Sequence, residues 1–428
     1  MHILMVTGEY PPMQGGVGAY TAALGQALAA QGVKVSVLTD RRASVHTEED
    51  SKSSTSLRSR TSMPQLIDKG IDRWGWGSLG KIADCAKSIG ADWIHVQYQT
   101  AAFGMHPAIN FGPLLWRRRG LRVAWTYHDL LFPYLFPKAG ARLRRWVTER
   151  PAFSADVTIV TNEQDRSQLA GRSGGRSGGR VANLAAIPIG SNIQGRELNA
   201  SERQAVRTAW GYADDALLLA YFGFLNRSKG GITLVETLHR LVAQGRNAHL
   251  LMIGERVGAS DPTNYAYLQE VEARIAALGL GERVRWTGRL ADEEVAASLN
   301  AIDALVMPYS DGASLRRGTL MAGLVNGCAI VTTTPQMPLS DLRDGSEWLT
   351  VAPDDPDATA QAVARIADDA HLAATLRANA RTASRLFGWE SIAARHLPLY
   401  SLSTGLSVGL SIGLSVGLAD PNPLPDNR

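Results

Sequence analysis

The sequence is poor in cysteine, in net charge and in long apolar runs, and each shortage excludes a class of protein. Its 428 residues include two cysteines, Cys85 and Cys328, too few for a disulfide framework or a cysteine metal cluster. The formal net charge is +4, from 44 basic and 40 acidic residues, and no array of cations with interleaved aromatics suggests nucleic acid. We therefore expect neither a metal site nor a nucleic-acid partner.

The two ends of the chain hold the only apolar stretches that concern a membrane. Residues 1–7 are apolar but follow no cationic leader, so we expect no signal peptide. Residues 401–418 repeat a Gly-Leu-Ser-Val/Ile pattern, too rich in serine and glycine for a spanning helix of about 20 apolar residues. We expect a cytoplasmic protein whose residues 401–428 are a low-complexity tail.

Length and hydrophobic pattern predict two domains of the same kind. One hydrophobic core stops growing at roughly 250–300 residues, and this chain has 428. Apolar stretches of strand length alternate with helical patterns in two successive series, which predicts two mostly parallel sheets covered by helices on both faces. The expected strands are residues 2–7, 33–38, 93–96, 121–127, 157–161 and 185–189, then 217–222, 249–253, 284–286, 304–307 and 329–332.

A polar stretch without periodicity separates the two series. We place the first domain at residues 1–190, a linker at 191–204 and the second domain at 205–383. Residues 41–64 are expected to be an exposed insertion, and the Gly-Arg-Ser-Gly repeat at 171–180 is expected to be a loop. Ligands are expected where the carboxyl ends of the strands of the two halves face each other.

Three glycines, Gly15, Gly16 and Gly18, open the first helix and are the first candidate site. Glycines there let a ligand approach the backbone, and free N–H groups at a helix start attract anions. A nicotinamide dinucleotide is the rival ligand, with Asp40 as the acid for its ribose. That alternative is weaker because Thr21 stands at the third glycine position of the fingerprint.

The second domain offers two further candidate sites, each after an expected strand. Lys229 stands just before a helix start at the end of the loop from Gly223, where a bound anion would explain an otherwise unfavourable cation. The segment 311–318 follows the strand 304–307 and carries two adjacent arginines that suit a diphosphate. The candidate donor-binding side chains and glycines of that segment are Asp311, Gly312, Ser314, Arg316 and Arg317.

Polar residues at strand ends of the first domain are weaker candidates. His128 and Asp129 follow the strand 121–127, and Tyr98 stands at the end of the strand 93–96. We expect His128 to point into the cleft, with Asp129 and Tyr98 on the acceptor side.

Taken together these segments resemble the GT-B glycosyltransferases, specifically the retaining family 4, over nearly the whole chain except the tail. The resemblance is carried by Pro11-Pro12, Gly15-Gly16-Val17-Gly18-x-Tyr20, His95-Val96-Gln97-Tyr98, His128-Asp129, Ile187-Pro188, Gly223 to Lys229-Gly230, residues 326–331 and Phe387-Gly388-Trp389-Glu390. It implies an α/β protein with two Rossmann-like domains facing across a cleft, and a final helix over 384–400 that returns to the first domain.

The resemblance also implies an activity and roles for the candidate residues. A sugar moves from a nucleotide-diphosphate-sugar to a glycan or lipid-linked acceptor, with retention of configuration and no bound metal or cofactor. The Gly16 loop and Lys229 serve the diphosphate, and His128 lies by the transferred sugar. The leaving diphosphate can itself take the proton of the acceptor, so little acid–base machinery is needed.

The sequence departs from the family pattern at three positions. Paired glutamates that the family usually carries fall here on Ser314 and Ala322, and its usual arginine in the first glycine loop falls on Phe224. We expect Arg316 or Arg317 to supply the missing positive charge, with Asp311 or Ser314 serving the sugar. The lost glutamates keep open a second possibility, a non-catalytic protein that binds nucleotide-sugars or glycans.

Two clusters of cations beside tryptophans concern the acceptor. They are residues 116–119 and 142–146, both in the first domain. Such clusters suit anionic lipid headgroups, while a solvated basic face explains them equally well. If lipid is the partner, the protein contacts the inner membrane face peripherally.

Overall fold

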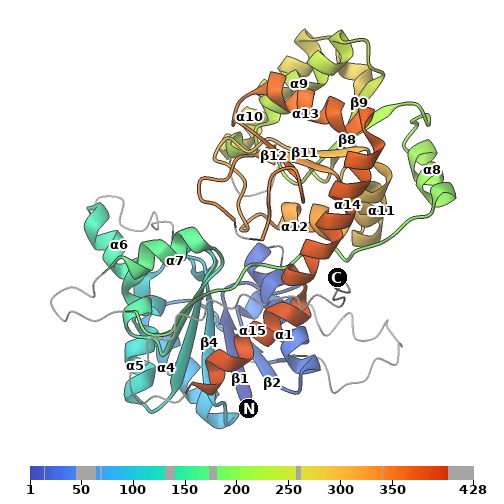
Figure 1. Ribbon diagram of the computed structural model, residues 1–428. Helices are drawn as coiled ribbons and strands as arrows, with labels where there is room; N and C mark the ends of the chain where they lie inside the picture. Colours follow the sequence, from blue (N-terminus) through green and yellow to red (C-terminus); the bar gives the residue numbers. More distant parts are fainter. Residues whose placement is uncertain are drawn as a thin grey trace, which may run out of the picture.

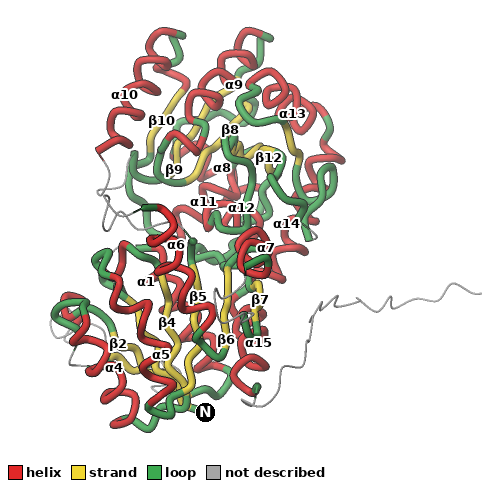
Figure 2. The backbone as a smooth tube through the Cα atoms, turned by 90° about the vertical axis from the view of Figure 1, so that its left-hand side faces the viewer, coloured by secondary structure: helices red, strands yellow, loops and turns green. Residues whose placement is uncertain are grey.

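The computed structural model describes residues 1–13, 15–44, 64–67, 70–130, 140–172, 181–256, 262–339 and 341–402. The expected insertion at 41–64, the repeat loop at 171–180 and the tail lie largely outside these ranges. Two α/β units are stacked, each built on its own parallel sheet (Figures 1 and 2). This arrangement confirms the fold class expected from the alternating strand and helix patterns.

The first unit contains a seven-stranded sheet in the order β3-β2-β1-β4-β5-β6-β7, with every pair parallel. Its strands are β1 (His2–Thr7), β2 (Lys34–Leu38), β3 (Gln65–Leu66), β4 (Trp93–Tyr98), β5 (Arg122–Tyr127), β6 (Val157–Val160) and β7 (Leu184–Ala186). Its α-helices are α1 (Gly16–Ala30), α2 (Arg41–Ser44), α4 (Trp76–Ser88), α5 (Gly112–Arg118), α6 (Ala141–Glu149) and α7 (Glu163–Ala170).

The second unit contains a six-stranded parallel sheet in the order β10-β9-β8-β11-β12-β13. Its strands are β8 (Leu217–Phe222), β9 (Ala248–Ile253), β10 (Val284–Trp286), β11 (Ala304–Met307), β12 (Ile330–Thr333) and β13 (Leu349–Val351). Its α-helices are α8 (Ala200–Ala209), α9 (Gly231–Ala243), α10 (Pro262–Ala277), α11 (Asp292–Ala301), α12 (Gly318–Val325), α13 (Pro356–Asp368) and α14 (Ala370–Ser384).

The strand orders fix where ligands can enter. In each sheet the chain reverses direction across the sheet once, between β1 and β4 in the first and between β8 and β11 in the second. The connections leaving such neighbours diverge to opposite faces, which opens a crevice at the carboxyl ends of the two strands. The expected glycine segments follow β1 and β8, and the expected arginine segment follows β11.

The last described helix, α15 (Trp389–Ser401), leaves the second unit and packs on the first beside α1 (Figure 1). Ile392 and Tyr400 are buried in the same apolar cluster as strands β1, β2 and β4. The indole of Trp93 donates a hydrogen bond of 3.1 Å to the carbonyl of Tyr400. The two units are therefore joined twice, by the linker before α8 and by α15.

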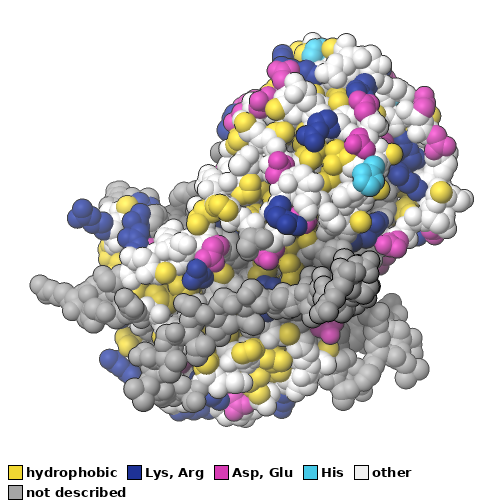
Figure 3. Space-filling model, viewed as in Figure 1, with side chains coloured by type: hydrophobic (Ala, Val, Ile, Leu, Met, Phe, Trp, Pro, Cys, Tyr) yellow, Lys and Arg dark blue, Asp and Glu magenta, His cyan; other side chains and the backbone are white. Residues whose placement is uncertain are grey.

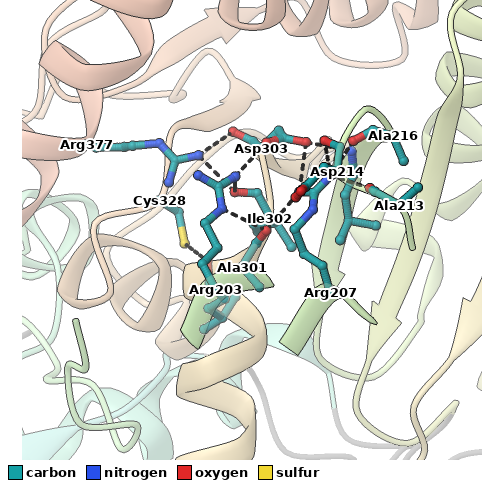
Figure 4. Close-up of polar contacts among 12 residues, drawn as sticks. Arg203, Arg207, Ala213, Asp214, Ala216, Ala301, Ile302, Asp303, Cys328 and Arg377 are labelled. Atoms are coloured by element: carbon teal, nitrogen blue, oxygen red, sulfur yellow. Dashed lines mark hydrogen bonds and ion pairs between the residues drawn. The ribbon is translucent and has the colours of Figure 1, made fainter. Parts of the chain in front are cut away.

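Helix α8 is fixed to the second unit by charge (Figure 4). The carboxylate of Asp303 accepts hydrogen bonds from Arg203, Arg207 and the backbone N–H of Leu218, at 2.6, 3.2 and 2.8 Å. Arg207 is 3% exposed and also donates to the carbonyl of Ala301 at the end of α11. Guanidinium groups at a helix carboxyl end satisfy unpaired carbonyls and complement the helix dipole.

No helix in the described ranges combines the length and the apolar content that a membrane crossing requires.

Removing the carboxylate of Asp303 tests this anchor. In Asp303→Asn the buried Arg207 keeps its charge but loses its anion, so we expect a loss of about 3 kcal/mol of unfolding free energy. Urea unfolding followed by fluorescence measures it. The matched control is Asp357→Asn, which breaks the exposed pair with Arg240 and should cost less. Equal losses in the two variants would contradict a buried electrostatic anchor.

Candidate functional site

Two glycines bring three segments together at the crevice between β8 and β11. Gly230 has φ +68°, and a Cβ there would lie 1.8 Å from the carbonyl oxygen of Pro308. Gly223 has φ +111°, and its Cβ would lie 2.8 Å from Cγ2 of Thr319 on α12. Side chains at these positions would push apart the loop after β8, the loop after β11 and the start of α12.

Lys229 lies inside this junction. Its ammonium is 3.5 Å from the place where a Cβ of Gly223 would stand. The pKa of Lys229 falls from 10.5 to about 8, mainly because of burial and also because of the nearby Arg317, while Asp311 acts in the opposite direction. Within the described residues the ammonium forms neither a hydrogen bond nor an ion pair. A largely buried cation without a direct partner is a site prepared for an anion.

Arg317 is the second cation of the junction. Its guanidinium lies 4.5 Å from the ring centroid of Tyr309 and donates to the carboxylate of Asp311 at 2.6 Å. Tyr309 is fully buried, and burial raises its pKa to about 12, so it stays neutral. Arg317 is also the residue before α12, where the first N–H groups of the helix point outward. One carboxylate thus faces two cations beside a helix start, which leaves one positive charge uncompensated.

Arg316 points elsewhere, although it is adjacent in sequence. It donates to the side-chain oxygen of Gln164 at 3.3 Å, and its other nitrogen lies 3.8 Å from the carboxylate of Asp165. Both partners belong to α7 of the first unit, so this arginine crosses between the units. Of the two candidate arginines, the structure brings Arg317 to Lys229 and Arg316 to the interdomain contact.

The remaining predicted residues of this loop differ in what they contribute. Gly312 has φ +80°, and a Cβ would lie 2.7 Å from the carbonyl of Thr334, so the turn itself requires glycine. The hydroxyl of Ser314 accepts a hydrogen bond of 3.3 Å from the N–H of Arg316. Ala322 is 1% exposed in the core. That position therefore offers no group to a ligand.

The glycine segment of the first unit is partly filled by the protein itself. Glu9 accepts hydrogen bonds from the N–H groups of Val17 and Gly18, at 3.0 and 3.1 Å. A Cβ on Gly15 would lie 2.1 Å from the same carboxylate, whereas one on Gly16 would meet nothing within 4 Å. Two amides that the sequence assigned to an external anion thus bind Glu9, and Gly16 alone borders open space. Nothing in the sequence position of Glu9 indicates that its carboxylate binds these two amides.

His128 stands at the end of β5, as expected. Its Nε2 is 3.0 Å from Oε1 of Gln97, and its ring meets Tyr20 edge-on at 4.6 Å. Loss of hydration on burial of the ring lowers the pKa of His128 to about 3, so the imidazole is neutral near pH 7. Its neighbour Asp129 accepts a hydrogen bond of 3.3 Å from Gln99.

Tyr98 occupies a different environment from His128. It is 1% exposed, its hydroxyl bonds to Thr100 at 3.0 Å, and its ring packs on Phe103 and Trp125 in the core of the first unit. Adjacent residues on a strand face opposite sides, which separates Tyr98 from Gln97. The hydroxyl of Tyr98 is therefore not presented to a ligand.

Comparison with known protein families shows to which family the chain belongs. Residues 14–181 match the model described as Glycosyltransferase Family 4, and residues 216–369 match the model described as Glycosyl transferases group 1. The first match covers β2 to β6 of the first sheet, and the second covers all six strands of the second sheet. The chain belongs to glycosyltransferase family 4.

Curated relatives of this family 4 chain are distant and match it in part. The D-inositol 3-phosphate glycosyltransferase of Streptomyces griseus is 25% identical over 202 residues, 47% of this chain and 42% of the relative. The alpha-D-kanosaminyltransferase of Streptomyces kanamyceticus is 24% identical over 255 residues, 58% of this chain and 60% of the relative. The chain thus aligns with about half the length of such relatives.

Solved structures match the family 4 fold over both units. Anabaena HepE in complex with UDP and glucose has a TM-score of 0.69 at 17% identity, covering 94% of this chain and 100% of HepE. Sucrose-phosphate synthase from Thermosynechococcus elongatus has a TM-score of 0.67 at 23% identity, covering 94% of this chain and 98% of the synthase. These likenesses confirm the GT-B fold expected from the sequence.

The structure argues against the dinucleotide alternative at both places that had suggested it, the glycine segment and Asp40. The α1 start carries the carboxylate of Glu9, which would repel a pyrophosphate there. Asp40, the expected ribose ligand, is bound by Nε and Nη2 of Arg42 at 2.9 and 3.0 Å. Among the described side chains, no cluster of three or more His, Cys, Asp or Glu could hold a metal ion.

The pKa of Lys229 gives a testable pH dependence. Between pH 8 and 10.5 the unfolded chain holds a proton that folded Lys229 has lost, so this residue makes stability rise with pH through that window. Titration of ¹³C-methylated lysines by NMR should show one resonance with a midpoint near 8. That resonance should be absent in Lys229→Met; a midpoint near 10.5 for Lys229 would contradict its burial.

Proposed function

We propose that this family 4 protein is a retaining glycosyltransferase that moves a sugar from a nucleotide-diphosphate-sugar to a glycan or lipid-linked acceptor. The observation that carries the proposal is the pair Lys229 and Arg317 at the crevice of the second sheet. These two cations share one carboxylate, Asp311, beside the open start of α12. A diphosphate supplies the missing negative charge, and HepE is a structural neighbour whose complexes contain UDP and UDP-glucose.

The chemistry follows from charge on the leaving group. The bond between the anomeric carbon and the diphosphate oxygen breaks, and Lys229, Arg317 and the first amides of α12 stabilise the developing negative charge. The acceptor hydroxyl attacks the face from which the diphosphate leaves. Its proton passes to a diphosphate oxygen, so the products are a glycoside and a nucleoside diphosphate. The reaction needs no protein carboxylate as a base.

Arg317 also accounts for the departures from the family pattern. Phe224 stands where the family has an arginine, and Arg317 returns a positive charge to the same junction from the loop after β11. Ala322 cannot hold a ribose hydroxyl because it is buried in the core. Donor recognition therefore rests on the diphosphate, with Asp311 and Ser314, from the loop after β11, as the polar groups proposed for the sugar.

A surface on the first unit suits an acceptor at a membrane. Trp76 and Trp146 are 59% and 50% exposed, and both pack against Phe111, at 5.3 and 6.1 Å between ring centroids. The guanidinium of Arg150 lies 5.0 Å from the ring centroid of Phe111 and 4.8 Å from that of Trp146. Arg142 on α6 is exposed, and Figure 3 shows basic side chains on the left, over α6. Aromatic rings beside cations match an anionic lipid interface.

The other cation cluster is less suited to lipid. Trp116 is fully buried and donates to the carbonyl of Leu79, so it cannot enter a membrane. Arg117 and Arg119 pair with Asp156 and Asp84. We therefore assign membrane contact, and with it a peripheral cytoplasmic location, to the surface around α6.

The donor proposal predicts how UDP stabilises variants. UDP should raise the melting temperature of the wild type, because a ligand that binds only the folded state stabilises it. Lys229→Met and Arg317→Met should each lose most of that shift, about 2 kcal/mol or more of binding for a charge-assisted contact. The control Arg227→Gln removes an exposed arginine of the same loop and should keep the shift.

Turnover separates catalysis from binding alone. Purified protein with UDP-glucose, as the named donor probe, is assayed for released UDP with and without glycan acceptors. Release that disappears in Arg317→Met supports the transferase. A UDP-induced melting shift without release from any nucleotide-sugar would favour the non-catalytic alternative, and a shift with NAD but not UDP would contradict the donor assignment.

The membrane proposal predicts binding to anionic vesicles. The wild type should sediment with phosphatidylglycerol vesicles and less with phosphatidylcholine vesicles. Arg142→Gln should weaken binding about fivefold, since one cation near an anionic surface contributes roughly 1 kcal/mol, and Trp146→Ser should weaken it as well. Tyr265→Ser, which removes a 58% exposed aromatic ring from α10, is the matched control. Equal binding by all forms would exclude the α6 surface.

A further inference from the structure

A buried chain of polar groups connects His128 to the last helix of the protein. Nε2 of His128 is 3.0 Å from Oε1 of Gln97, and Nε2 of Gln97 is 3.2 Å from Nε2 of His95. Nδ1 of His95 is 2.7 Å from the hydroxyl of Tyr400 on α15. Gln97 and His95 are fully buried and Tyr400 is 2% exposed, so water cannot replace the links among these three residues, whereas His128 is half-buried.

With the amide oxygen of Gln97 facing His128 and its nitrogen facing His95, one consistent set of hydrogen-bond directions runs along the chain. The amide nitrogen of Gln97 can only donate, so in this arrangement Nε2 of His95 accepts from it and from the hydroxyl of Thr126 at 2.8 Å, and the His95 proton stands on Nδ1. From there it is donated to the hydroxyl of Tyr400. The amide oxygen of Gln97 can only accept, so His128 must carry its proton on Nε2. Each link therefore depends on the link before it.

The same helix reaches His128 from its other end. Tyr20, which meets the His128 ring edge-on, packs in turn on Trp389 at 5.2 Å. Trp389 begins α15 and donates a hydrogen bond of 2.7 Å to the carbonyl of Ser191 in the interdomain linker. A Cβ on Gly190 would lie 2.7 Å from this indole. Both ends of α15 are thus connected to His128: the first turn through Trp389 and Tyr20, and the last turn through Tyr400, His95 and Gln97.

We propose that Gln97, His95 and Tyr400 are positioning residues, which hold His128 in one tautomer and so leave its Nδ1 as a hydrogen-bond acceptor for a ligand hydroxyl. Within the described residues, Nδ1 of His128 forms no hydrogen bond. The use of that acceptor by a donor sugar rests on the proposed function, whereas the tautomer itself does not. The helix that joins the two units is then also the outer end of the chain that orients His128.

The tautomer can be observed without any substrate. Long-range ¹H–¹⁵N spectra of protein labelled with ¹⁵N in histidine distinguish a protonated from an unprotonated ring nitrogen, and His128→Gln assigns the resonances. In the wild type near pH 7, we expect His128 as a single neutral species with its proton on Nε2. Because no nucleotide or acceptor is present, failure here is distinct from failure of the glycosyl-transfer proposal.

Tyr400→Phe should change the tautomer of His128, although Tyr400 lies on α15 and reaches His128 only through His95 and Gln97. Without the tyrosine hydroxyl, Nδ1 of His95 has no acceptor for its proton. The tautomer with the proton on Nε2 then becomes the more stable one, because Nε2 donates to the hydroxyl of Thr126 at 2.8 Å. The amide of Gln97 then turns over and presents its NH₂ group to His128, whose proton moves to Nδ1. Gln97→Leu removes the link outright and should leave His128 as a mixture of both tautomers.

Tyr127→Phe is the matched control. It removes another buried hydroxyl of the same unit, bonded to the carbonyl of Thr148 at 2.9 Å and outside the chain. It should leave His128 on Nε2, and melting curves verify that all variants are folded. The proposal is overturned if wild-type His128 carries its proton on Nδ1, if Tyr400→Phe leaves the tautomer unchanged, or if Tyr127→Phe changes it equally.

Discussion

Two cations held close together in a largely buried junction are the constraint on which this structure depends. Lys229 and Arg317 repel each other, and Asp311 compensates for one of them. The repulsion persists only because glycines at 223 and 230 let three segments close around the pair. A site that keeps such an imbalance without a ligand gains stability when a polyanion binds, and this gain is the physical basis of the proposed diphosphate site.

The general architecture could be predicted from the sequence because it depends on periodicity. Alternating apolar strands and helical patterns indicated both sheets, and glycines after strands indicated the crevices. Two short edge strands, β3 and β13, were not expected, because two or three residues carry too little pattern. Expected strand 185–189 ends earlier, at Ala186, where the chain leaves the sheet before the prolyl residue Pro188.

The candidate site was less accessible to sequence reasoning. Adjacent arginines look alike in a sequence, yet Arg316 contacts α7 and Arg317 contacts Tyr309. Glu9 acts on an amide nine residues away, and Tyr400 acts on a histidine about 300 residues away. Such pairings depend on tertiary structure alone. The one available signal was His95 and Gln97, two polar residues on one face of an otherwise apolar strand.

The two halves of the site therefore have different physical bases. In the proposed site the second unit supplies positive charge for a diphosphate and the first unit supplies a neutral, oriented imidazole, while α15 and Arg316 join the units. The most direct test of the central claim is a crystal structure with UDP bound. We predict the diphosphate within hydrogen-bonding distance of Nζ of Lys229 and of the Arg317 guanidinium, at the start of α12. A diphosphate bound elsewhere, with Arg317 still paired only to Asp311, would contradict the account.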